Sequence, residues 1–351
     1  MGENPRGFEM ENKKKINILD VASHAGVSKT TVSRVMNNNG YVAQRTREKV
    51  NRAISELNYA PSAFAQNIRT GKSKTIAMMI PDTSNTFYME IFKAVEDIAL
   101  KNGYMVILCN TRRSFETEVK YADKLMKRNI DGLLYFTQQR TPKNEAFFRE
   151  LSKKVPLVFM DYAFADVEDI CCVAMECKSC SMDAVKLLYD KGKRNIAYIN
   201  LPDANNVTLN RCEGYKQGLR NLGLSCRPGL VILPKESKTR TMVEIGYGAA
   251  KKLITENSDV DAVMTASDQL AIGVIKYLKA AKIRIPDDVS VLGFDDTVMC
   301  EIVNPPLTTI RQPIRKMGNE AAKLLIKMIT EEQISQIKII YNGSVIERQS
   351  T

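Results

Sequence analysis

The sequence predicts a small all-helical N-terminal domain followed by a larger α/β part with two doubly wound parallel sheets. Residues 16–37 read INILDVASHAGVSKTTVSRVMN, two short amphipathic stretches that flank a glycine. From Thr75 onward, short apolar runs alternate with amphipathic stretches, which is typical of strand–helix–strand units in parallel sheets. The chain of 351 residues is longer than one typical domain, and 44% of its residues are apolar, enough for more than one core.

The first 15 residues are not expected to form an element of this fold. They begin MGENPRGFEMEN, which is polar and contains two glycines and a second methionine at Met10. This segment is interpreted as a disordered extension or as a product of start-site choice.

Residues 17–36 predict two helices joined by a tight turn. Asn17 can cap the first helix, and Asp20 lies in its first turn, where negative charge suits the exposed N–H groups. Gly26 supplies the turn, and Ser28 can cap the second helix. The apolar residues of the two helices are then expected to face each other: Val21, Ala22, Ala25, Val32, Val35 and Met36. The polar residues of the second helix face outward: Lys29, Thr30, Thr31, Ser33 and Arg34.

A helix-turn-helix places the start of its second helix against base edges in the major groove of DNA. Lys29 and Thr30 are therefore the expected base readers, and Arg34 can fork onto a guanine or contact a phosphate. The alternative is an ordinary helical hairpin whose polar face is only solvated. The DNA-binding interpretation is favoured because the glycine, the cap and the apolar spacing all agree.

The hairpin and the segment TREKVNRAISELNYAPSAFAQNIRTGKSKTIAMMIP that follows shortly after it resemble transcriptional regulators of the lactose-repressor (LacI/GalR) family. The resemblance implies that residues 16–60 form a DNA-binding domain with a third helix, which buries Val50, Ile54 and Leu57. Where family members have a capping Ser or Asn this chain has Ala43, a loss worth roughly 1 kcal/mol unless DNA or Thr46 compensates. The DNA-binding residues expected in this domain and the next segment are Asn17, Ser28, Lys29, Thr30, Thr31, Arg34, Asn37, Tyr41, Ala65 and Ile68.

The resemblance identifies residues 61–74 as a hinge helix and linker, opened by Pro61 and Ser62 and closed by Gly71. It implies that this helix folds when two subunits lie side by side on an operator. The residue in the position of the family's minor-groove wedge is Ile68, and such a wedge kinks a flexible base step. The alternative is a plain linker in which Ile68 is buried.

The charge distribution, and the lack of an apolar stretch long enough for a membrane span, are consistent with a DNA-binding protein. Residues 1–74 contain 13 Lys or Arg against 6 Asp or Glu, whereas the remaining residues contain 38 against 34. A basic excess favours phosphate contacts and predicts binding that weakens steeply with salt. Because no apolar stretch approaches the length of a membrane span and no secretory signal is visible, we expect a cytoplasmic protein without membrane contact.

The strands expected in the first sheet are TIAMMIP, YMVILCN, DGLLYFT and PLVFMD, with helices at about 88–102, 116–128 and 144–153. NIAYIN, LVIL, DAVMTA and VSVLGFD form a second set. The resemblance implies an effector-binding and dimerisation core of the periplasmic-binding-protein type over residues 75–351, with three crossings between two subdomains. We place the N-subdomain at about 75–170 plus about 312–332, and the C-subdomain at about 171–311 plus about 333–351.

Ligands of such folds bind at the carboxyl ends of strands, in the cleft between the halves. The resemblance implies that Arg211 and Asp295 point into this cleft, where the alternative is a structural ion pair. The other expected effector-binding residues are Phe87, Tyr88, Asp161, Tyr162 and Ser267, although core packing is the alternative for one of the two adjacent aromatic residues.

Two departures from the family limit the choice of effector. Met175 and Glu176 occupy the positions where many relatives have an Asp-Asn pair, so an acidic partner for ligand hydroxyls is missing or displaced. Asn205 and Val207 replace groups that the purine repressor uses, which argues against a purine base.

Catalytic and metal chemistry find little support in the chain. His24 is the only histidine, and Gly246-Tyr247-Gly248 lies inside an expected helix and does not open one. Cys177 and Cys180 have the spacing of a zinc or redox site, but a single pair is a weak signal, and free thiols are expected for the cluster between Cys171 and Cys180. No enzyme activity, metal or cofactor is therefore expected.

The expected partners are a pseudo-palindromic double-stranded DNA operator, a second copy of the chain and a small polar effector, best a carbohydrate. A homodimer is expected because no leucine heptad follows the final segment IKIIYNGSVIERQST. The main alternative is a core that responds to a protein partner such as a phosphocarrier protein. An enzyme and a solute receptor are more remote alternatives.

Overall fold

The computed structural model describes residues 16–36, 39–59, 71–136, 140–160, 167, 169–202, 206–235 and 241–351, without the side chain of Asn206. The chain divides into two compact units, residues 1–73 and residues 74–351. They are called the headpiece and the core below. The expected N-terminal extension and most of the expected hinge helix lie outside the described residues.

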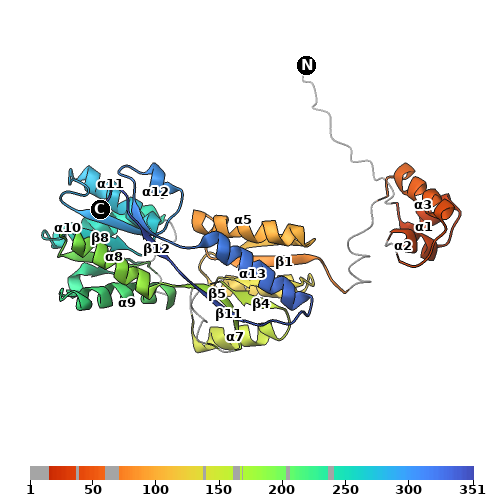
Figure 1. Cartoon of the computed structure of the whole chain (residues 1–351), viewed down its shortest axis with the longest axis horizontal. Helices are drawn as coiled ribbons and strands as arrows, with labels where there is room; N and C mark the ends of the chain where they lie inside the picture. Colours follow the sequence, from red (N-terminus) through yellow and green to blue (C-terminus); the bar gives the residue numbers. More distant parts are fainter. Residues whose placement is uncertain are drawn as a thin grey trace, which may run out of the picture. The chain divides into compact units, whose positions relative to one another are not determined.

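The headpiece consists of α1 (Ile18–Ala25), α2 (Lys29–Met36) and α3 (Gln44–Glu56) (Figure 1). Gly26 ends α1 with φ 63°, a left-handed conformation that glycine adopts without steric cost. The fully buried residues of its core are Val21, Ala22, Val32, Val35, Val50 and Ala53, and Ile54 and Leu57 pack against them. The predicted three-helix arrangement is confirmed, down to the apolar face that each helix buries.

The first sheet of the core has the strand order β11-β5-β4-β3-β1-β2, and all of its neighbouring strands are parallel. Its strands are β1 (Thr75–Ile80), β2 (Met105–Asn110), β3 (Gly132–Tyr135), β4 (Leu157–Phe159), β5 (Cys171–Glu176) and β11 (Lys338–Asn342). Four of these match the expected strands, whereas β5 and β11 were not placed in this sheet by the sequence.

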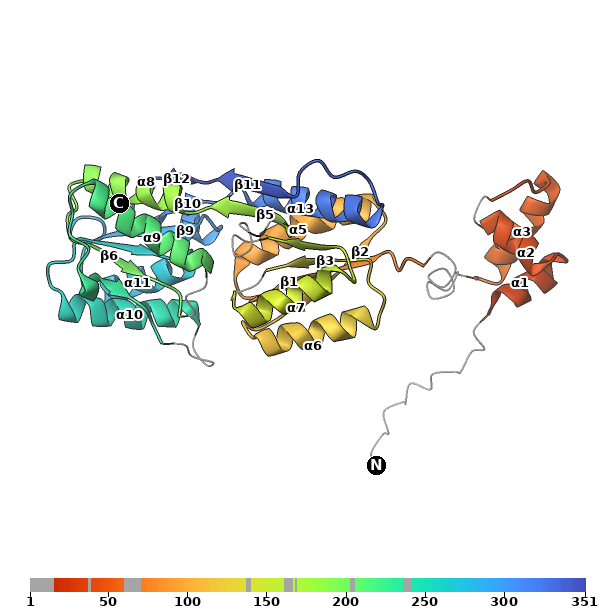
Figure 2. The same cartoon turned by 90° about the horizontal axis from the view of Figure 1, so that it is seen from below.

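Helices cover both faces of the first sheet, as Figure 2 shows. One face is covered by α5 (Thr86–Lys101) and α13 (Ile314–Ile329), and the other by α6 (Phe115–Met126) and α7 (Pro142–Ser152). Successive residues of a strand point to opposite faces, so Met78 packs into one hydrophobic cluster and Met79 into the other. With helices on both faces, the sheet is doubly wound, as predicted.

The second sheet has the order β12-β10-β9-β8-β6-β7, and every pair is parallel except β12 with β10. Its strands are β6 (Ile196–Ile199), β7 (Val231–Ile232), β8 (Ala262–Thr265), β9 (Ser290–Asp295), β10 (Thr308–Arg311) and β12 (Ser344–Ile346). The helices of this half are α8 (Lys178–Asp190), α9 (Asn206–Asn221), α10 (Met242–Glu256), α11 (Asp268–Ala280) and the short α12 (Met299–Ile302), with a 3-10 turn at Pro228–Leu230.

Two glycines allow α10 and α11 to pack backbone against backbone. A Cβ at Gly246 would lie 2.3 Å from the carbonyl oxygen of Leu270, and a Cβ at Gly273 would lie 2.2 Å from that of Val243. Gly248, two residues further along α10, has open space where its own Cβ would lie. The Gly-Tyr-Gly segment is thus inside a helix, as expected, and its first glycine serves helix packing.

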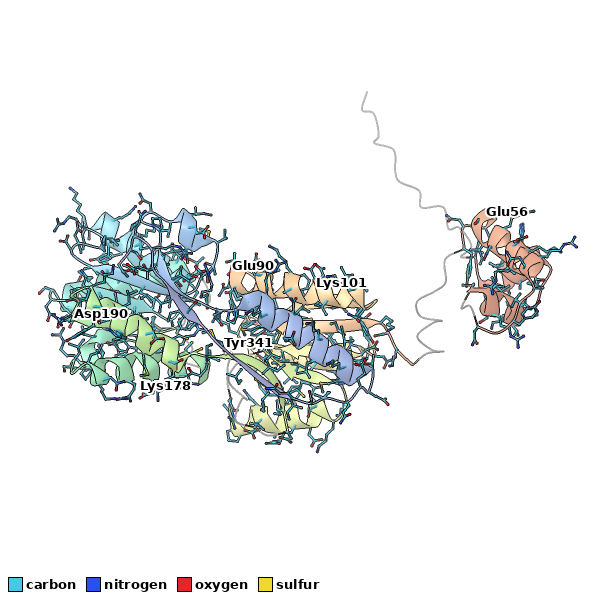
Figure 3. The ribbon with its side chains drawn as sticks, in the orientation of Figure 1. Glu56, Glu90, Lys101, Lys178, Asp190 and Tyr341 are labelled. Atoms are coloured by element: carbon cyan, nitrogen blue, oxygen red, sulfur yellow. The ribbon has the colours of Figure 1, made fainter. Side chains whose placement is uncertain are left out.

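The chain crosses three times between the halves, from β5 into α8, from β10 into α13 and from β11 into β12. The first crossing ends at Lys178, and the third begins after Asn342, the residue that follows Tyr341; Lys178 and Tyr341 are labelled in Figure 3. A Cβ at Gly343 would lie 2.8 Å from both the carbonyl oxygen of Arg311 and the Sδ of Met175, so the three crossings pack side by side.

Two expected subdomain boundaries were therefore wrong. The sequence analysis began the C-subdomain at 171 and again at 333, but β5 and β11 pair in parallel with each other inside the first sheet. The chain leaves that sheet only after Glu176 and after Asn342. The error has a physical cause, because β11 is a half-exposed edge strand that lacks a strongly apolar pattern. Among the described residues, no helix is long and apolar enough to cross a membrane.

Candidate functional site

Side-chain caps form at the starts of both α1 and α2, the helices joined by the Gly26 turn. The Asn17 side chain accepts hydrogen bonds from the N–H groups of Leu19 and Asp20, and the Asp20 carboxylate accepts one from the Asn17 N–H. The Ser28 hydroxyl accepts a hydrogen bond from the Thr31 N–H at 3.1 Å. These caps satisfy N–H groups that a helix start leaves open, so Asn17 fixes where α1 begins and Ser28 fixes where α2 begins.

The outward face of α2 carries the expected DNA-contacting groups. Lys29, Thr30 and Arg34 are exposed. Thr31 is half-buried, and its hydroxyl is hydrogen-bonded to the Ser28 hydroxyl, with 2.9 Å between the two oxygens. Tyr41 is 92% exposed. The expected DNA-binding residues Asn37, Ala65 and Ile68 lie outside the described residues.

The start of α3 has no side-chain cap. Ala43 occupies the cap position, and only backbone hydrogen bonds, from Thr46 and Arg47 to its carbonyl oxygen, close the first turn. Thr46 contacts Ala43 through its backbone N–H, and this hydrogen bond is not a side-chain cap.

A second candidate site is a pocket between the two sheets of the core. It has about 720 Å³ of empty space, which includes open solvent at its mouth. Residues from both halves line it: Asn85, Phe87, Tyr88, Arg113, Phe136, Met160, Met175, Cys177, Leu201, Val207, Thr208, Arg211, Met242, Ser267, Gln269, Asp295, Gln312 and Met317. Many of them follow the carboxyl end of a parallel strand, which is where open α/β sheets bind ligands.

The structure brings five of the seven predicted effector residues together in this pocket: Phe87, Tyr88, Arg211, Ser267 and Asp295. The other two, Asp161 and Tyr162, lie outside the described residues. Their common location does not test their role in binding, which stays a prediction.

Three aromatic rings form one wall of the pocket. Phe87 and Tyr88 meet edge to face at 5.1 Å between ring centroids, and Tyr88 meets Phe136 in the same way at 5.2 Å. Both residues of the adjacent pair therefore line the pocket while packing against each other. The Asn85 side chain fixes them by accepting a hydrogen bond from the Phe87 N–H at the start of α5.

Arg211 is a buried cation at the base of the pocket, with its side chain 9% exposed. Its Nη1 donates a 2.6 Å hydrogen bond to the carbonyl oxygen of Ala266, and its guanidinium carbon lies 3.6 Å from the centre of the Phe294 ring. Its Nε has no hydrogen-bond partner. Burial lowers the pKa of Arg211, but Asp295 and the Cys177 thiol more than offset this effect, so the group stays charged.

Asp295 lies at the end of β9, with Oδ1 3.6 Å from Nη1 of Arg211 and 2.7 Å from the donating Nε2 of Gln312. Burial raises the pKa of Asp295 to about 7, against the attraction of Arg211. Its backbone has φ 121°, a conformation that non-glycine residues rarely adopt and that costs of order 1–3 kcal/mol. Such strain is often found at binding sites, where the surrounding structure holds the residue in place.

The neighbouring Ser267 and Asp268 have different tasks. The Ser267 hydroxyl accepts a hydrogen bond from the Leu270 N–H and caps α11 while facing the pocket. Asp268 lies beneath it and accepts hydrogen bonds from the Thr297 N–H at 2.8 Å and the Thr309 hydroxyl at 2.6 Å. Burial raises the pKa of Asp268.

Sequence reasoning missed several polar residues of the pocket. Arg113 follows β2, Gln312 follows β10, and Gln269 follows Ser267 on α11. Gln269 spans the two halves, because its Nε2 donates a 3.2 Å hydrogen bond to the carbonyl oxygen of Ser84. A place just after an expected strand could have revealed Arg113, whereas the strand before Gln312 was itself not expected.

The departures from the family also have positions in the structure. Met175 and Val207 line the pocket, and Asn205 lies outside the described residues. Glu176 faces away, since its carboxylate accepts hydrogen bonds from the N–H groups of Lys178 at 2.6 Å and Ser179 at 2.9 Å. Glu176 therefore does not belong to the described lining, and whether an acidic partner is missing or displaced stays a prediction.

All eight cysteines are free thiols. Cys177 lies in the pocket, and burial raises its pKa to about 11, so it is a neutral thiol. In the part of the chain that the structure describes, no group of three or more His, Cys, Asp or Glu side chains could hold a metal ion.

Comparisons with known proteins match both units. Residues 17–62 match the family described as bacterial regulatory proteins, lacI family, and residues 185–351 match a periplasmic binding protein-like domain. The chain is 34% identical to the HTH-type transcriptional regulator RegA of Clostridium saccharobutylicum, over 95% of this chain and 98% of the relative. It is 33% identical to the ribose operon repressor of Escherichia coli strain K12, over 94% of this chain and 98% of the repressor.

Solved structures are similar over the same length. The lac repressor dimer bound to operator and the anti-inducer ONPF has a TM-score of 0.85 at 26% identity, covering 96% of this chain and 99% of that one. A complex of the transcriptional regulator CelR with cellobiose has a TM-score of 0.70 at 28% identity, covering 96% and 100%. With these relatives matched along both the headpiece and the core, the chain belongs to the lacI family of bacterial regulatory proteins.

Proposed function

We propose that this DNA-binding regulator represses transcription as a homodimer on a pseudo-palindromic operator, under the control of a small polar metabolite in the pocket around Arg211. The observation that supports the proposal is that one chain contains both parts of a ligand-controlled switch, a DNA-binding headpiece and a core with a pocket. Its headpiece exposes Lys29, Thr30 and Arg34 at the start of a capped helix, and its core holds a buried cation facing a pocket between two halves.

The headpiece residues suit direct reading of bases. A helix that starts in the major groove presents its first residues to base edges, and an arginine one turn later reaches a guanine or a phosphate. Lys29 and Thr30 have these positions in α2, and Arg34 lies one turn further. A second copy of the headpiece would read the other half of a two-fold symmetric site.

The names of relatives favour a sugar or a sugar derivative as effector. One relative is a ribose operon repressor, and two similar structures are complexes with cellobiose and with D-xylulofuranose. The three rings of Phe87, Tyr88 and Phe136 offer this chain an aromatic wall of the kind on which sugar rings stack.

Control of DNA binding would act through the angle between the halves. A ligand that binds one arrangement of the halves more tightly shifts the population toward it. β1 begins at Thr75, directly after the linker, so a change in its position reaches the hinge segment through the covalent chain. In the dimer, this would alter the free energy of folding the two hinge helices on DNA.

We expect the protein to act in the cytoplasm, where operator DNA is found, and to catalyse no reaction. The pocket contains a buried neutral thiol and a single carboxylate among its described lining residues, without a general base beside a nucleophile.

Selection of operator sequences from random duplex DNA by the full-length protein tests the proposal. Selected sequences should be two-fold symmetric, and Lys29→Ala should relax the preference at one position of each half-site, with a loss of about 1–3 kcal/mol in binding. Lys49→Ala removes the same charge from α3 and should leave the selected sequence unchanged. Enrichment of no symmetric sequence would contradict the proposal. The alternative is control by a phosphocarrier protein. It predicts that the phosphocarrier protein changes the operator affinity of the regulator and that no metabolite does.

A further inference from the structure

We infer that the effector carries an anionic group, a carboxylate or a phosphate, whose charge is balanced by Arg113 and Arg211. The inference rests on the proposed function, because it assumes that a metabolite occupies the pocket. It goes beyond that function by naming the chemical class of the metabolite, and it depends on which hydrogen-bonding groups of the lining are still available to a ligand.

The described lining contains one carboxylate, and its amide oxygens are those of Asn85, Gln269 and Gln312. A neutral sugar brings several hydroxyl donors, which need carboxylate or amide oxygens as partners. Asp295 is the single carboxylate among the described lining residues, and it already accepts a hydrogen bond from Gln312. The Asn85 side-chain oxygen is used by the Phe87 N–H, and the Ser267 hydroxyl accepts from the Leu270 N–H.

The other acidic residues around the pocket are engaged elsewhere. Glu176 caps the start of α8 with both carboxylate oxygens. Asp268 is held by the Thr297 N–H and the Thr309 hydroxyl beneath the pocket. Asp296 forms ion pairs with Arg311 at 2.5 Å and with Arg348 at 2.7 Å. None of the three belongs to the lining.

Arg211 retains an unused donor. Its side chain is 9% exposed and its Nε has no hydrogen-bond partner, which is costly for a buried charged group. Asp295 lies 3.6 Å from Nη1, beyond hydrogen-bond distance. A carboxylate or phosphate oxygen would supply the missing acceptor and would add a negative charge to a described lining with two guanidinium groups and one carboxylate, since both groups match the planar guanidinium fork.

Arg113 brings a second guanidinium to the lining from the other half of the core. It follows β2, its backbone has φ 57°, and its side chain is 12% exposed. Its ion-pair partner Asp82 lies 3.5 Å away and also accepts hydrogen bonds from the Ser84 N–H and hydroxyl. The charge of Asp82 is thus shared, and it lies outside the lining. An anion in the pocket would be attracted by both halves and would favour their closure.

The test uses full-length protein bound to its operator and a small-molecule extract of the cells in which the protein is native. The extract is separated on an anion-exchange resin at neutral pH, and each fraction is tested for a change in operator affinity. The activity should be in the retained fraction. Treatment of that fraction with alkaline phosphatase should abolish the activity of a phosphate ester and spare that of a carboxylate.

Arg113→Gln should need about 10- to 100-fold more of the retained fraction for the same response, the loss expected for a hydrogen bond to a charged group. Arg113→Lys should keep part of the response, because it keeps the charge. Arg112→Gln is the matched control, since Arg112 is exposed and outside the lining. It should respond like the wild type, and a melting curve of each variant verifies that the core is folded.

Activity in the unretained fraction would overturn the inference and leave the proposed function intact. A normal response of Arg113→Gln would remove Arg113 from the anion site. Absence of activity from every fraction, with operator binding intact, would count against control by a metabolite and so against the proposed function itself.

Discussion

Arg211 and Asp295 form a buried ion pair at the base of the cleft pocket, with 3.6 Å between Nη1 and Oδ1. The separation is within ion-pair range but too long for a hydrogen bond. Both groups also have other partners, the Ala266 carbonyl oxygen for Arg211 and Gln312 for Asp295. The sequence analysis offered a structural ion pair as the alternative to effector binding. The geometry combines both, since the pair is made but leaves Nε of Arg211 unused.

Arg211→Ala should abolish the response to effector and leave operator affinity without effector within about tenfold of the wild type, one step of 1.4 kcal/mol. The reason is that the guanidinium contacts the pocket and not the DNA-binding headpiece. Operator affinity measured with and without active extract gives the answer. Arg220→Ala, on the exposed face of the same helix, is the control. A variant at Arg211 that responds normally would exclude this residue from the effector site.

The stability of the core should fall as the pH rises from about 4 to about 7, because of Asp295. Burial raises the pKa of Asp295 to about 7, so the folded protein holds a proton that the unfolded chain has released in this range. When the folded state binds more protons, the free energy of unfolding decreases with rising pH. Urea denaturation of the wild type and of Asp295→Asn at a series of pH values measures the effect. Asp295→Asn should show the smaller decrease; equal slopes would mean that Asp295 does not carry this proton.

Gly246→Ala should lower the free energy of unfolding of the core by about 1–3 kcal/mol, because the new Cβ would meet the Leu270 backbone and push α10 from α11. Gly248→Ala changes the same helix where space is open, and should raise it by up to about 1 kcal/mol through helix propensity. Urea denaturation of both variants decides the point. Equal effects of the two substitutions would contradict the close packing of these helices.

Ala43→Ser should stabilise the headpiece by about 1 kcal/mol, because it supplies a side-chain cap that α3 lacks. Hydrogen exchange of the headpiece amides, followed by mass spectrometry in the full-length protein, should slow in α3. Asn17→Ala provides the opposite comparison, since it removes an existing cap from α1. Unchanged exchange in Ala43→Ser would mean that a serine at this position does not form the cap.

Ile68→Ala should weaken binding to the operator and spare salt-dependent binding to random DNA. A wedge acts only at the kinked centre of a specific site, whereas nonspecific binding depends on phosphate contacts. Affinities for operator and random duplexes over a series of salt concentrations separate the two effects. An equal loss on both DNA types would refute the wedge and favour the plain-linker alternative.

The headpiece could be predicted almost completely from the sequence because its signals are local. Asn17, Gly26 and Ser28 each fix one helix end, and the buried valines of α1 and α2 recur at helical spacing. The first strands of each sheet were predicted for a similar reason, since fully buried parallel strands are continuous apolar runs.

The missed strands have patterns that depend on distant partners. In β10, Thr308 and Thr309 are completely buried although their side chains are polar. They are accommodated because Thr309 donates to Asp268 and the Thr308 N–H donates to the Ser350 hydroxyl. Gln312 belongs to the pocket only because β10 ends beside β9. No local pattern in the sequence reports such pairings, so this part of the site required the structure.

The most direct test of the central claim is footprinting of the full-length protein on genomic DNA of the organism that encodes it, at low ionic strength. Reading by α2 of two headpieces predicts a protected sequence with two-fold symmetry, whose protection is lost when Lys29 and Thr30 are both replaced by alanine. Protection of no symmetric sequence, or protection that survives the double replacement, would contradict DNA recognition by this helix.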